Sequence, residues 1–308
     1  MIRHLFIVNP KAGVKSPVEE ITERIRRAFI LNTDRENEKY EILLTQKKGD
    51  ATEFARAACR EPYEKTRIYA CGGDGTLHEV INGVVGADSV AVCPVPVGSG
   101  NDFIRTLEGF SKEDFLDLSA CIRGTEIPCD VLRCGDVYSL NSISVGLDAI
   151  TARRQNRIKK LPLISGGAAY KISLGYTFLS SMNNPVSFEV DGEALSVGNG
   201  SVTLAVVANG RYYGGGFKAA PLAEINDGLM DFVTIHSLSR MEFLRYVKDY
   251  KEGKHLETVP DIYFTRCKRI RLLSEKPLCL QADGEIFQME NPEIEIIPAA
   301  VRLVLPAR

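Results

Sequence analysis

Three glycine-rich segments are the clearest candidates for phosphate binding. They are NPKAG at 9–13, GGDGT at 72–76 and PVGSGND at 96–102. Glycine lets the backbone approach a phosphate closely, and the start of a helix offers main-chain N–H groups to an anion. Glycine pairs also mark ordinary turns, so one such segment is equally consistent with a structural role. Three in succession favour a phosphate site.

An acidic residue stands inside the second segment. Asp74 is flanked by Gly72, Gly73 and Gly75. A bare carboxylate would repel a phosphate, so Asp74 is consistent with phosphate chemistry if it acts through a magnesium ion or orients one. We therefore expect Mg²⁺ near this segment.

Two carboxylates close to the C-terminus suit proton transfer. A primary alcohol does not ionise near neutral pH, so its proton must be taken by a base during phosphoryl transfer. Asp283 and Glu285 flank Gly284 in a predicted hairpin turn. Asp-Gly is also a strong hairpin signal, and Asp191-Gly192-Glu193 repeats the motif, so the spacing alone does not separate a catalytic turn from a structural one.

Two further charged segments allow a functional and a structural interpretation. Glu224 and Asp227 are hard oxygen ligands three residues apart, which suits Mg²⁺ or Ca²⁺, although a solvated acidic turn has the same pattern. RRQNRIKK at 153–160 places five positive charges before the apolar LPLI, which suits an anionic membrane surface. A solvated helix face is the alternative. Asp130 fits either a cleft or the turn at the edge of a strand.

The first part of the chain must position the glycine segments. Apolar runs at 5–8, 40–45, 67–71 and 90–97 read as strands, and each is followed by a glycine-containing or polar turn. Strands alternating with helices predict a parallel α/β sheet, whose ligands bind at the carboxyl ends of its strands. The expected helices cover 16–30, 49–61, 76–86 and 101–107, with Thr76 and Glu79 placed for a capping box.

The pattern changes near residue 126. Strand-like segments then dominate and are separated by Asp-Gly and Asn-Gly pairs, which are typical of hairpins. This half is predicted to be a β-sandwich with inserted helices. We expect an α/β domain at 1–125 and the β-sandwich domain at 126–308.

Several protein classes are excluded by missing motifs and by composition. No P-loop, dinucleotide-binding G-x-G-x-x-G, G-x-S-x-G or protein-kinase H-R-D is present, and His78 reads as a helix-surface residue. The net charge of −2 gives no basis for nucleic-acid binding. Eight cysteines without a C-x-x-C pair indicate reduced, buried thiols and a cytoplasmic protein. No apolar stretch is long enough to span a membrane, so we expect contact with lipid to be peripheral.

The same segments carry a family resemblance. GGDGTLHEVING, PVPVGSGNDFIR and the opening NPKAG resemble the diacylglycerol kinase catalytic-domain family, in particular its bacterial lipid kinases. GGDGT is shared with NAD kinases and phosphofructokinases, whereas Asn101, Asp102, Phe103 and Arg105 match a block more particular to lipid kinases. NSISVGLDAITARR, ANGRYYGGGFKAAPLAEINDGLMDF and QADGEIF extend the resemblance to the C-terminus.

The resemblance implies an ATP-dependent kinase that phosphorylates a lipid hydroxyl, most simply that of diacylglycerol, with ATP and Mg²⁺ as cofactors. It implies an α/β nucleotide-binding domain like that of NAD kinase and phosphofructokinase, a β-sandwich domain with the active site in the cleft between the two, and a last strand at 299–306 that returns to the first domain. The implied base is Asp283 or Glu285, and the implied metal ligands are Glu224, Asp227 and the carbonyl of Leu229. The implied nucleotide-site residues are Asn9, Pro10, Ala12, Gly13, Thr45, Gly72, Gly73, Asp74, Gly75, Thr76, Ser99, Gly100 and Asn101.

Other functions stay open from the sequence. Some relatives have a lysine directly after the NPxxG glycine, but here Val14 stands there and Lys15 follows, so a role for Lys15 is not assigned. The acceptor could instead be a sphingoid base, undecaprenol or NAD, or the chain could sense nucleotide or lipid without catalysis. The expected partners are a lipid at a membrane surface and, because some relatives pair through the second domain, a second copy of the chain.

Overall fold

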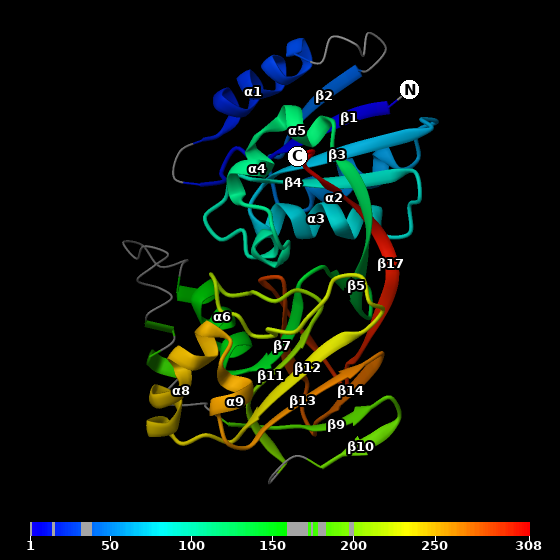
Figure 1. The fold of residues 1–308 in the computed structure, drawn as a ribbon. Helices are drawn as coiled ribbons and strands as arrows, with labels where there is room; N and C mark the ends of the chain where they lie inside the picture. Colours follow the sequence, from blue (N-terminus) through cyan, green and yellow to red (C-terminus); the bar gives the residue numbers. More distant parts are fainter. Residues whose placement is uncertain are drawn as a thin grey trace. The chain divides into compact units, whose positions relative to one another are not determined.

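A computed structural model describes residues 2–13, 16–31, 39–158, 172–173, 175–177, 183–196 and 200–308. The chain divides into two compact units (Figure 1). The first unit comprises residues 1–131 and 297–308, and the second comprises 132–296. The division therefore falls within a strand, β5 (Thr125–Cys134), and a few residues after the expected boundary near 125.

The first unit is built on a parallel sheet. Its strands are ordered β4-β3-β1-β2, and every pairing among them is parallel. The central strands are buried along most of their length, which explains their continuous apolar runs. The bounds are β1 Ile2–Val8, β2 Lys39–Leu44, β3 Lys65–Gly72 and β4 Val90–Pro96.

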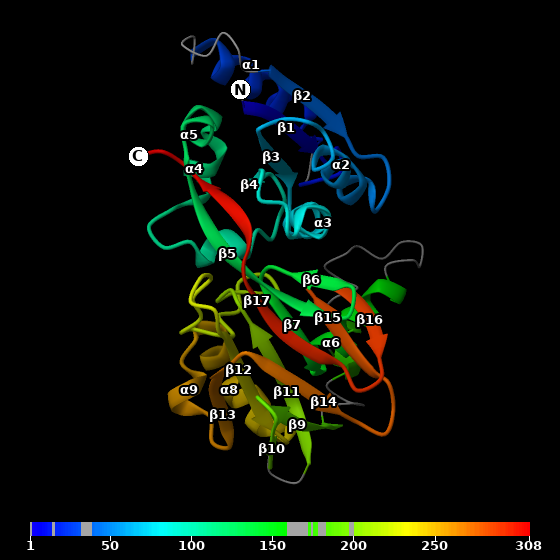
Figure 2. The same cartoon turned by 90° about the vertical axis from the view of Figure 1, so that its right-hand side faces the viewer.

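Helices cover both faces of this sheet. Helices α1, α4 and α5 lie on one face, while α2 and α3 lie on the other (Figures 1 and 2). The expected helix at 101–107 is only a 3-10 turn, η1, over Phe103–Thr106. The bounds of the helices are α1 Val18–Leu31, α2 Asp50–Ala58, α3 Asp74–Val84, α4 Lys112–Leu116 and α5 Leu118–Ile122.

The start of α3 differs from the predicted capping box. Gly73 is the N-cap residue and the helix begins at Asp74, so Thr76 already lies in the first turn. Glu79 instead accepts a hydrogen bond from the N–H of Ala51 at 3.2 Å. His78 is buried rather than on the helix surface, which corrects the interpretation of that residue.

The last strand contributes to the first unit. The C-terminal part of β17 (Glu293–Leu305) runs parallel to β4, with Arg302 opposite Ala91 and Leu303 opposite Val92. Asp130 in β5 is buried, and its Oδ1 accepts a hydrogen bond from the N–H of Ala299 at 2.7 Å. Asp130 therefore ties two chain segments together within the first unit.

The second unit contains a seven-stranded, antiparallel sheet. Its order is β13-β12-β11-β7-β15-β16, with β8 paired to β11. β9, β10, β14 and the start of β17 form further antiparallel ladders. The bounds are β6 Val137–Ser139, β7 Ser142–Gly146, β8 Asn184–Pro185, β9 Ser187–Val190, β10 Glu193–Leu195, β11 Ser201–Ala208, β12 Met230–His236, β13 Ile262–Cys267, β14 Arg269–Leu273, β15 Leu278–Ala282 and β16 Glu285–Met289.

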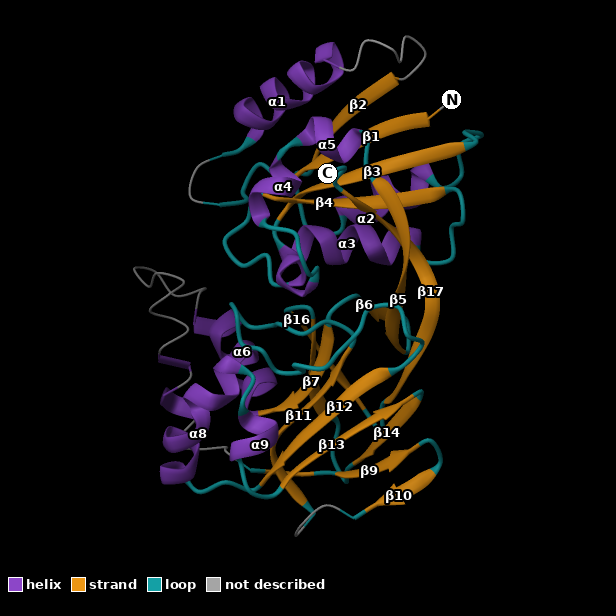
Figure 3. Ribbon diagram, viewed as in Figure 1, coloured by secondary structure: helices purple, strands orange, loops and turns teal. Residues whose placement is uncertain are grey.

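The second unit has two hydrophobic layers. The sandwich core includes Val207, Phe188, Phe232 and Ile270. A second cluster, with Val206, Ile235 and Tyr250, involves the helices α6 (Leu147–Ile158), α8 (Arg240–Glu252) and α9 (His255–Thr258). Figure 3 shows these three helices on one side of the unit. Alternate residues of β11 thus face a sheet on one side and helices on the other.

The cysteine side chains are unpaired and mostly buried, as the sequence predicted. All eight cysteines are free thiols, and seven are buried while Cys59 is half-buried. Among the described residues, no helix is both long and apolar enough to cross a membrane.

Candidate functional site

The three glycine-rich segments converge in the first unit. The side-chain amide of Asn9 donates to the Thr76 hydroxyl at 3.3 Å, which joins the first segment to the second. The N–H of Gly98 donates to the carbonyl of Gly72 at 3.0 Å, which joins the second to the third. Thr45 is held beside them, because its N–H donates to the carbonyl of Val8 at 3.0 Å. The sequence therefore correctly grouped these segments at one edge of the sheet.

Glycine is required where the second and third segments touch. A Cβ atom at Gly98 would overlap the Cα atom of Gly73, and one at Gly72 would overlap the side chain of Thr76. At Gly75, by contrast, no atom lies within 4 Å of the position of an added Cβ. Two glycines are thus explained by packing within the protein, whereas Gly75 leaves open space beside the start of α3.

Asp74 links the second segment to the third. Its Oδ1 accepts hydrogen bonds from the N–H groups of Asp102 at 2.7 Å and Phe103 at 3.4 Å. A Cβ atom at Gly100 would lie 2.6 Å from Asp74 Oδ2, so Gly100 lets the segment pass close to the carboxylate. The acidic residue therefore has a structural explanation beside the predicted role near magnesium.

The predicted nucleotide residues form an open surface. Gly13, Gly75 and Ser99 are exposed, and Asn9 and Asn101 are half-buried. The hollow between the second and third segments measures about 10 Å³, which is roughly the space of one water molecule. A nucleotide would therefore lie on the solvent side of these segments, where α3 presents its first N–H groups.

In the second unit, Asp283 is held by a dense set of donors. Its carboxylate accepts four hydrogen bonds from residues 139–142: Oδ1 from the Ser139 hydroxyl at 2.7 Å and from the N–H groups of Asn141 and Ser142, both at 3.1 Å, and Oδ2 from the N–H of Leu140 at 2.8 Å. Hydrogen bonds of this kind stabilise the charged form of a carboxylate and fix its orientation.

The two Asp-Gly-Glu turns have the same backbone. Asp283 and Gly284 have φ of 47° and 93°, and Asp191 and Gly192 have 49° and 90°, so both are hairpin turns with two left-handed residues. Asp191 also accepts main-chain hydrogen bonds, from Lys268 and Arg269. The local geometry does not distinguish the two copies, so their surroundings must. Glu285 opens β16 and is half-buried.

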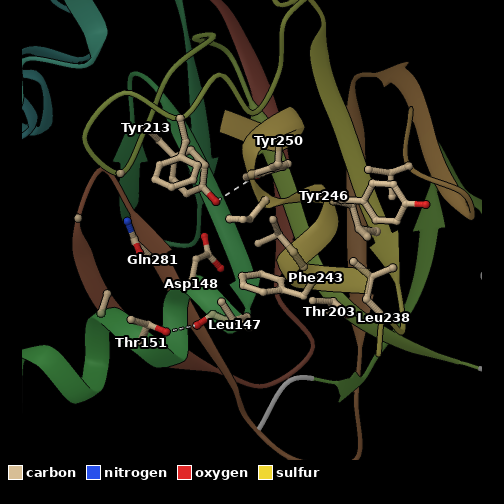
Figure 4. A pocket seen from close by; sticks show the side chains of 18 residues that line it. Leu147, Asp148, Thr151, Thr203, Tyr213, Leu238, Phe243, Tyr246, Tyr250 and Gln281 are labelled. Carbon is tan, nitrogen blue, oxygen red and sulfur yellow. Dashed lines mark hydrogen bonds between the residues drawn. The ribbon is translucent and has the colours of Figure 1, made fainter. Parts of the chain in front are cut away.

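An apolar cavity of about 450 Å³ lies in the second unit, and its lining includes Gly284. Most of the wall is aliphatic or aromatic, with Leu204, Phe217, Ile235 and Phe243 among the lining residues (Figure 4). The hydroxyl groups of Tyr213 and Tyr250 approach to 3.1 Å at its wall. This volume lies in the range of sites for small organic ligands. The later Asp-Gly-Glu turn thus borders an apolar cavity.

One carboxyl group faces this cavity. Asp148 lies in the first turn of α6, and its Oδ1 accepts a hydrogen bond from the N–H of Ala149 at 2.8 Å. Its Oδ2 is shielded from solvent and has no hydrogen-bond partner among the described residues. Burial raises the pKa of Asp148 from its ordinary 3.8 to about 6, although the nearby Ser144 and Tyr213 side chains partly oppose this. Sequence reasoning missed Asp148, even though it belongs to the GLDA motif.

The predicted metal loop has suitable ligands but is already compensated in charge. Asp227 Oδ1 accepts a hydrogen bond from the N–H of Leu229 at 2.9 Å, and its Oδ2 lies 3.8 Å from the Arg266 guanidinium. Glu224 is exposed. In the described part of the chain, no group of three His, Cys, Asp or Glu side chains is arranged to hold a metal ion. The predicted set has only two carboxylates beside the Leu229 carbonyl, and one of the two lies near Arg266, so the ligand assignment stays a prediction.

A buried carboxyl group, that of Asp231, also lies beside this loop. Arg266 pairs with Asp231 at 3.1 Å and donates to the carbonyl of Leu222 at 2.6 Å. Burial raises the pKa of Asp231 from 3.8 to about 6, while Arg266 opposes this shift and Asp227 reinforces it. Arg266 thus anchors the loop, and its positive charge would repel a cation bound there.

Some predicted residues lie outside the described part of the chain. These are Val14, Lys15, Lys159, Lys160 and the apolar segment 161–164. In the remainder of the basic run, Arg153 and Arg154 are half-buried, and the Arg154 guanidinium lies 4.5 Å from the centre of the Tyr176 ring. Membrane docking by 153–160 stays a prediction.

Comparisons with known proteins confirm the predicted fold class and family. The family model described as "Diacylglycerol kinase catalytic domain" matches residues 3–134, and the one described as "YegS C-terminal NAD kinase beta sandwich-like domain" matches 141–305. The crystal structure of a diacylglycerol kinase from Bacillus anthracis superposes with a TM-score of 0.69 at 22% identity, covering 98% of this chain and 96% of that one.

Curated relatives align along almost the whole chain. A protein named diacylglycerol kinase from Bacillus subtilis is 29% identical over 99% of this chain and 97% of its own length. A protein from Alcanivorax borkumensis named probable lipid kinase YegS-like is 29% identical over 92% of both chains. Because the two family models together span nearly all of this chain, it belongs to the diacylglycerol kinase and YegS family of lipid kinases.

Proposed function

We propose that the protein transfers the γ-phosphoryl group of ATP to the hydroxyl of diacylglycerol, giving phosphatidic acid. The observation that carries this proposal is the apolar cavity in the second unit. Its lining includes Gly284, which stands between Asp283 and Glu285 in the sequence. An acceptor with an acyl chain can bury that chain in the cavity while its hydroxyl stays near the turn. The name of the Bacillus subtilis relative supports the same acceptor.

The glycine-rich segments support a nucleotide as the donor. Gly75 leaves room at the start of α3, where main-chain N–H groups and the helix dipole favour a phosphate. Asn9, Thr76 and Ser99 would contribute polar side chains at the same edge. Mg²⁺, when bound with ATP, would neutralise charge on the phosphates.

The proposed reaction has one proton transfer. The acceptor oxygen forms a bond to the γ-phosphorus as the bond from that phosphorus to the bridging oxygen breaks, and ADP leaves with this oxygen. The hydroxyl proton passes to a carboxylate, for which Asp283 is the first candidate and Glu285 the second. The four donors around Asp283 would hold it in place for this transfer.

A sphingoid base is a second candidate acceptor, because Asp148 faces the same cavity. An ammonium group there would pair with Oδ2, which has no partner among the described residues. Diacylglycerol has one hydroxyl, which is placed near the Asp-Gly-Glu turn, and no second donor for Asp148 Oδ2. Diacylglycerol would therefore bind with Asp148 protonated. The raised pKa of Asp148 makes that form accessible near neutral pH.

Incubation with labelled ATP, Mg²⁺ and separate acceptors tests the proposal. The acceptors are diacylglycerol, sphingosine, undecaprenol and NAD, and the products are separated between organic and aqueous phases. We expect label in phosphatidic acid. Label in sphingosine phosphate or undecaprenyl phosphate alone would replace the acceptor, and label only in the aqueous NAD product would overturn the assignment to lipid.

A further inference from the structure

Helix α8 has two chemically different faces. Phe243, Tyr246, Val247 and Tyr250 recur at helical spacing and line the apolar cavity (Figure 4). The helix is well defined at both ends, with a capping box between Ser239 and Glu242 at its start and a left-handed Gly253 at its end. The inner face of α8 therefore forms part of the wall of the proposed acyl-chain site.

The opposite face exposes two large apolar side chains. Met241 is 76% exposed, more than any other large hydrophobic side chain described, and Leu244 is 58% exposed. At about 100° per residue, these two lie roughly 60° apart and point away from the cavity-lining face. Exposed apolar side chains that neighbour one another suit contact with an apolar partner.

Basic residues surround this apolar pair. Relative to Leu244, Arg240, Lys248 and Lys251 lie within about 40° around the helix, and Arg245 lies about 100° away. The one acidic residue on this side, Glu252, is shared by Lys248 at 3.9 Å and Lys254 at 2.8 Å. Glu242 and Asp249 lie about 140–160° from Leu244, next to Arg245 at the edge of this side. The outer face is therefore positive around an apolar centre.

We propose that this outer face of α8 docks on an anionic membrane surface. The α8 docking face comprises Arg240, Met241, Leu244, Arg245, Lys248 and Lys251. Its two apolar side chains would enter the interfacial layer, while its cations would pair with lipid headgroups. Since a helix is about 10 Å across, docking brings the bilayer within one helix diameter of the cavity wall.

A bilayer fits this face better than a soluble protein does. Four cations flank only two apolar side chains, whereas the centre of a protein–protein interface is depleted of lysine. Because the inner face of α8 lines the cavity, an acyl chain that leaves the bilayer would meet α8 first. This role of docking in substrate delivery rests on the proposed function. The docking itself depends only on the charges and apolar side chains of α8.

Co-sedimentation with vesicles tests the docking face without catalysis. The intact protein, with no ATP, is mixed with vesicles of phosphatidylcholine alone or of phosphatidylcholine with phosphatidylserine. We expect binding to the anionic vesicles that weakens with salt. The double variant Met241→Glu/Leu244→Glu should lower vesicle partitioning by about tenfold or more, and Arg245→Gln/Lys248→Gln by a comparable factor.

Matched controls separate the docking face from general effects. Ile30→Glu changes an exposed isoleucine of α1 (68% exposed) in the same way and should leave binding unchanged. Arg153→Gln/Arg154→Gln tests the basic run on α6. Unchanged binding of both α8 variants, or loss of binding only in the α6 variant, would overturn the proposal.

The docking result is distinguishable from failure of the proposed function. With a short-chain, water-soluble diacylglycerol as acceptor, the Met241→Glu/Leu244→Glu variant should keep wild-type turnover and lose activity only on vesicle-bound substrate. If the protein phosphorylates no lipid but still binds anionic vesicles through α8, the docking face stands and the proposed acceptor falls.

Discussion

The Ser139 hydroxyl donates a hydrogen bond of 2.7 Å to Asp283 Oδ1 and joins the end of β6 to the Asp-Gly-Glu turn, 144 residues later in the chain. The N–H groups of Leu140, Asn141 and Ser142 donate to the same carboxylate. Asp283 is therefore both the first candidate base and the residue that holds the connection between β6 and β7.

Replacing Asp283 should consequently affect both turnover and folding. In Asp283→Asn, one carboxylate oxygen becomes an NH₂ group, which cannot accept a hydrogen bond. At least one of the donors in residues 139–142 therefore loses its acceptor and is left unsatisfied. We expect a loss of about 1–3 kcal/mol in the free energy of unfolding together with at least about a hundredfold loss in kcat. Thermal unfolding and steady-state kinetics measure the two effects.

Two controls separate the roles of Asp283. Ser139→Ala removes one donor and keeps the carboxylate, so it should lose roughly 1 kcal/mol of stability and retain most of the turnover. Glu285→Gln should fold normally, and its kcat reports whether Glu285 takes the proton. Near-normal turnover in a folded Asp283→Asn protein would rule out Asp283 as the base.

Gly75 and Gly98 make opposite predictions for the same change. Gly75→Ala places a methyl group in open space within the first turn of α3, so stability should stay equal or rise by up to about 1 kcal/mol. Gly98→Ala places its methyl group against the backbone of Gly73 and should cost about 2–3 kcal/mol. Thermal unfolding without nucleotide separates these outcomes.

Nucleotide binding then tests whether a phosphate of ATP occupies the open space beside Gly75. If a phosphate lies against Gly75, the methyl group of Gly75→Ala should raise the Kd for ATP about tenfold or more while the protein stays fully folded. Calorimetric titration with ATP measures this Kd. Wild-type affinity in Gly75→Ala would mean that the triphosphate does not approach the start of α3.

The cavity makes a prediction about chain length. Ala152 on α6 lines it, so Ala152→Phe adds a ring to the space in which we place the acyl chain. The variant should raise the KM for long-chain diacylglycerol at least about fivefold and change the KM for a short-chain acceptor and for ATP by less than about twofold. An equal rise for both chain lengths would place the acyl chain elsewhere.

The sequence located the glycine-rich segments well because each follows a buried strand. The carboxyl ends of parallel strands meet at one edge, so Asn9, Asp74 and Ser99 could be grouped before any contact was known. The contacts themselves could not be predicted, since they depend on close approaches such as that of Gly98 to Gly73. His78 was misjudged because the side of a helix that becomes buried depends on its neighbours.

The cavity could not be read from the sequence for the same reason. Its wall combines residues of α6 and β11 with residues of α8, which follow those of α6 by about 90 positions, and each looks like an ordinary core residue in its own segment. Asp148 was missed because nothing in GLDA shows that its Oδ2 would be buried at the wall of an apolar cavity. The two Asp-Gly-Glu copies likewise differ in what surrounds them and not in their own conformation.

Asp148 should make stability depend on pH in a direction opposite to that of most carboxylates. Its pKa rises from 3.8 to about 6 in the folded protein because burial disfavours the charged form. Between these values the folded state binds the proton and the unfolded state does not, so stability contributed by Asp148 is full below about pH 4 and is lost as the pH rises through 6.

The variant Asp148→Asn isolates this contribution, because Asp231 also has a raised pKa and titrates in both proteins. The neutral amide resembles the protonated carboxyl, so wild type and variant should have similar stability near pH 4. At pH 7.5 the variant should be more stable by about 1–3 kcal/mol, measured by urea unfolding at each pH.

Asp130→Asn is the matched control, since Asp130 accepts a hydrogen bond from the N–H of Ala299 and its replacement should give no gain in stability at pH 7.5. A stability difference between Asp148→Asn and wild type that does not grow from pH 4 to pH 7.5 would show that Asp148 is ionised in the folded protein, and would remove the protonated form that diacylglycerol binding requires.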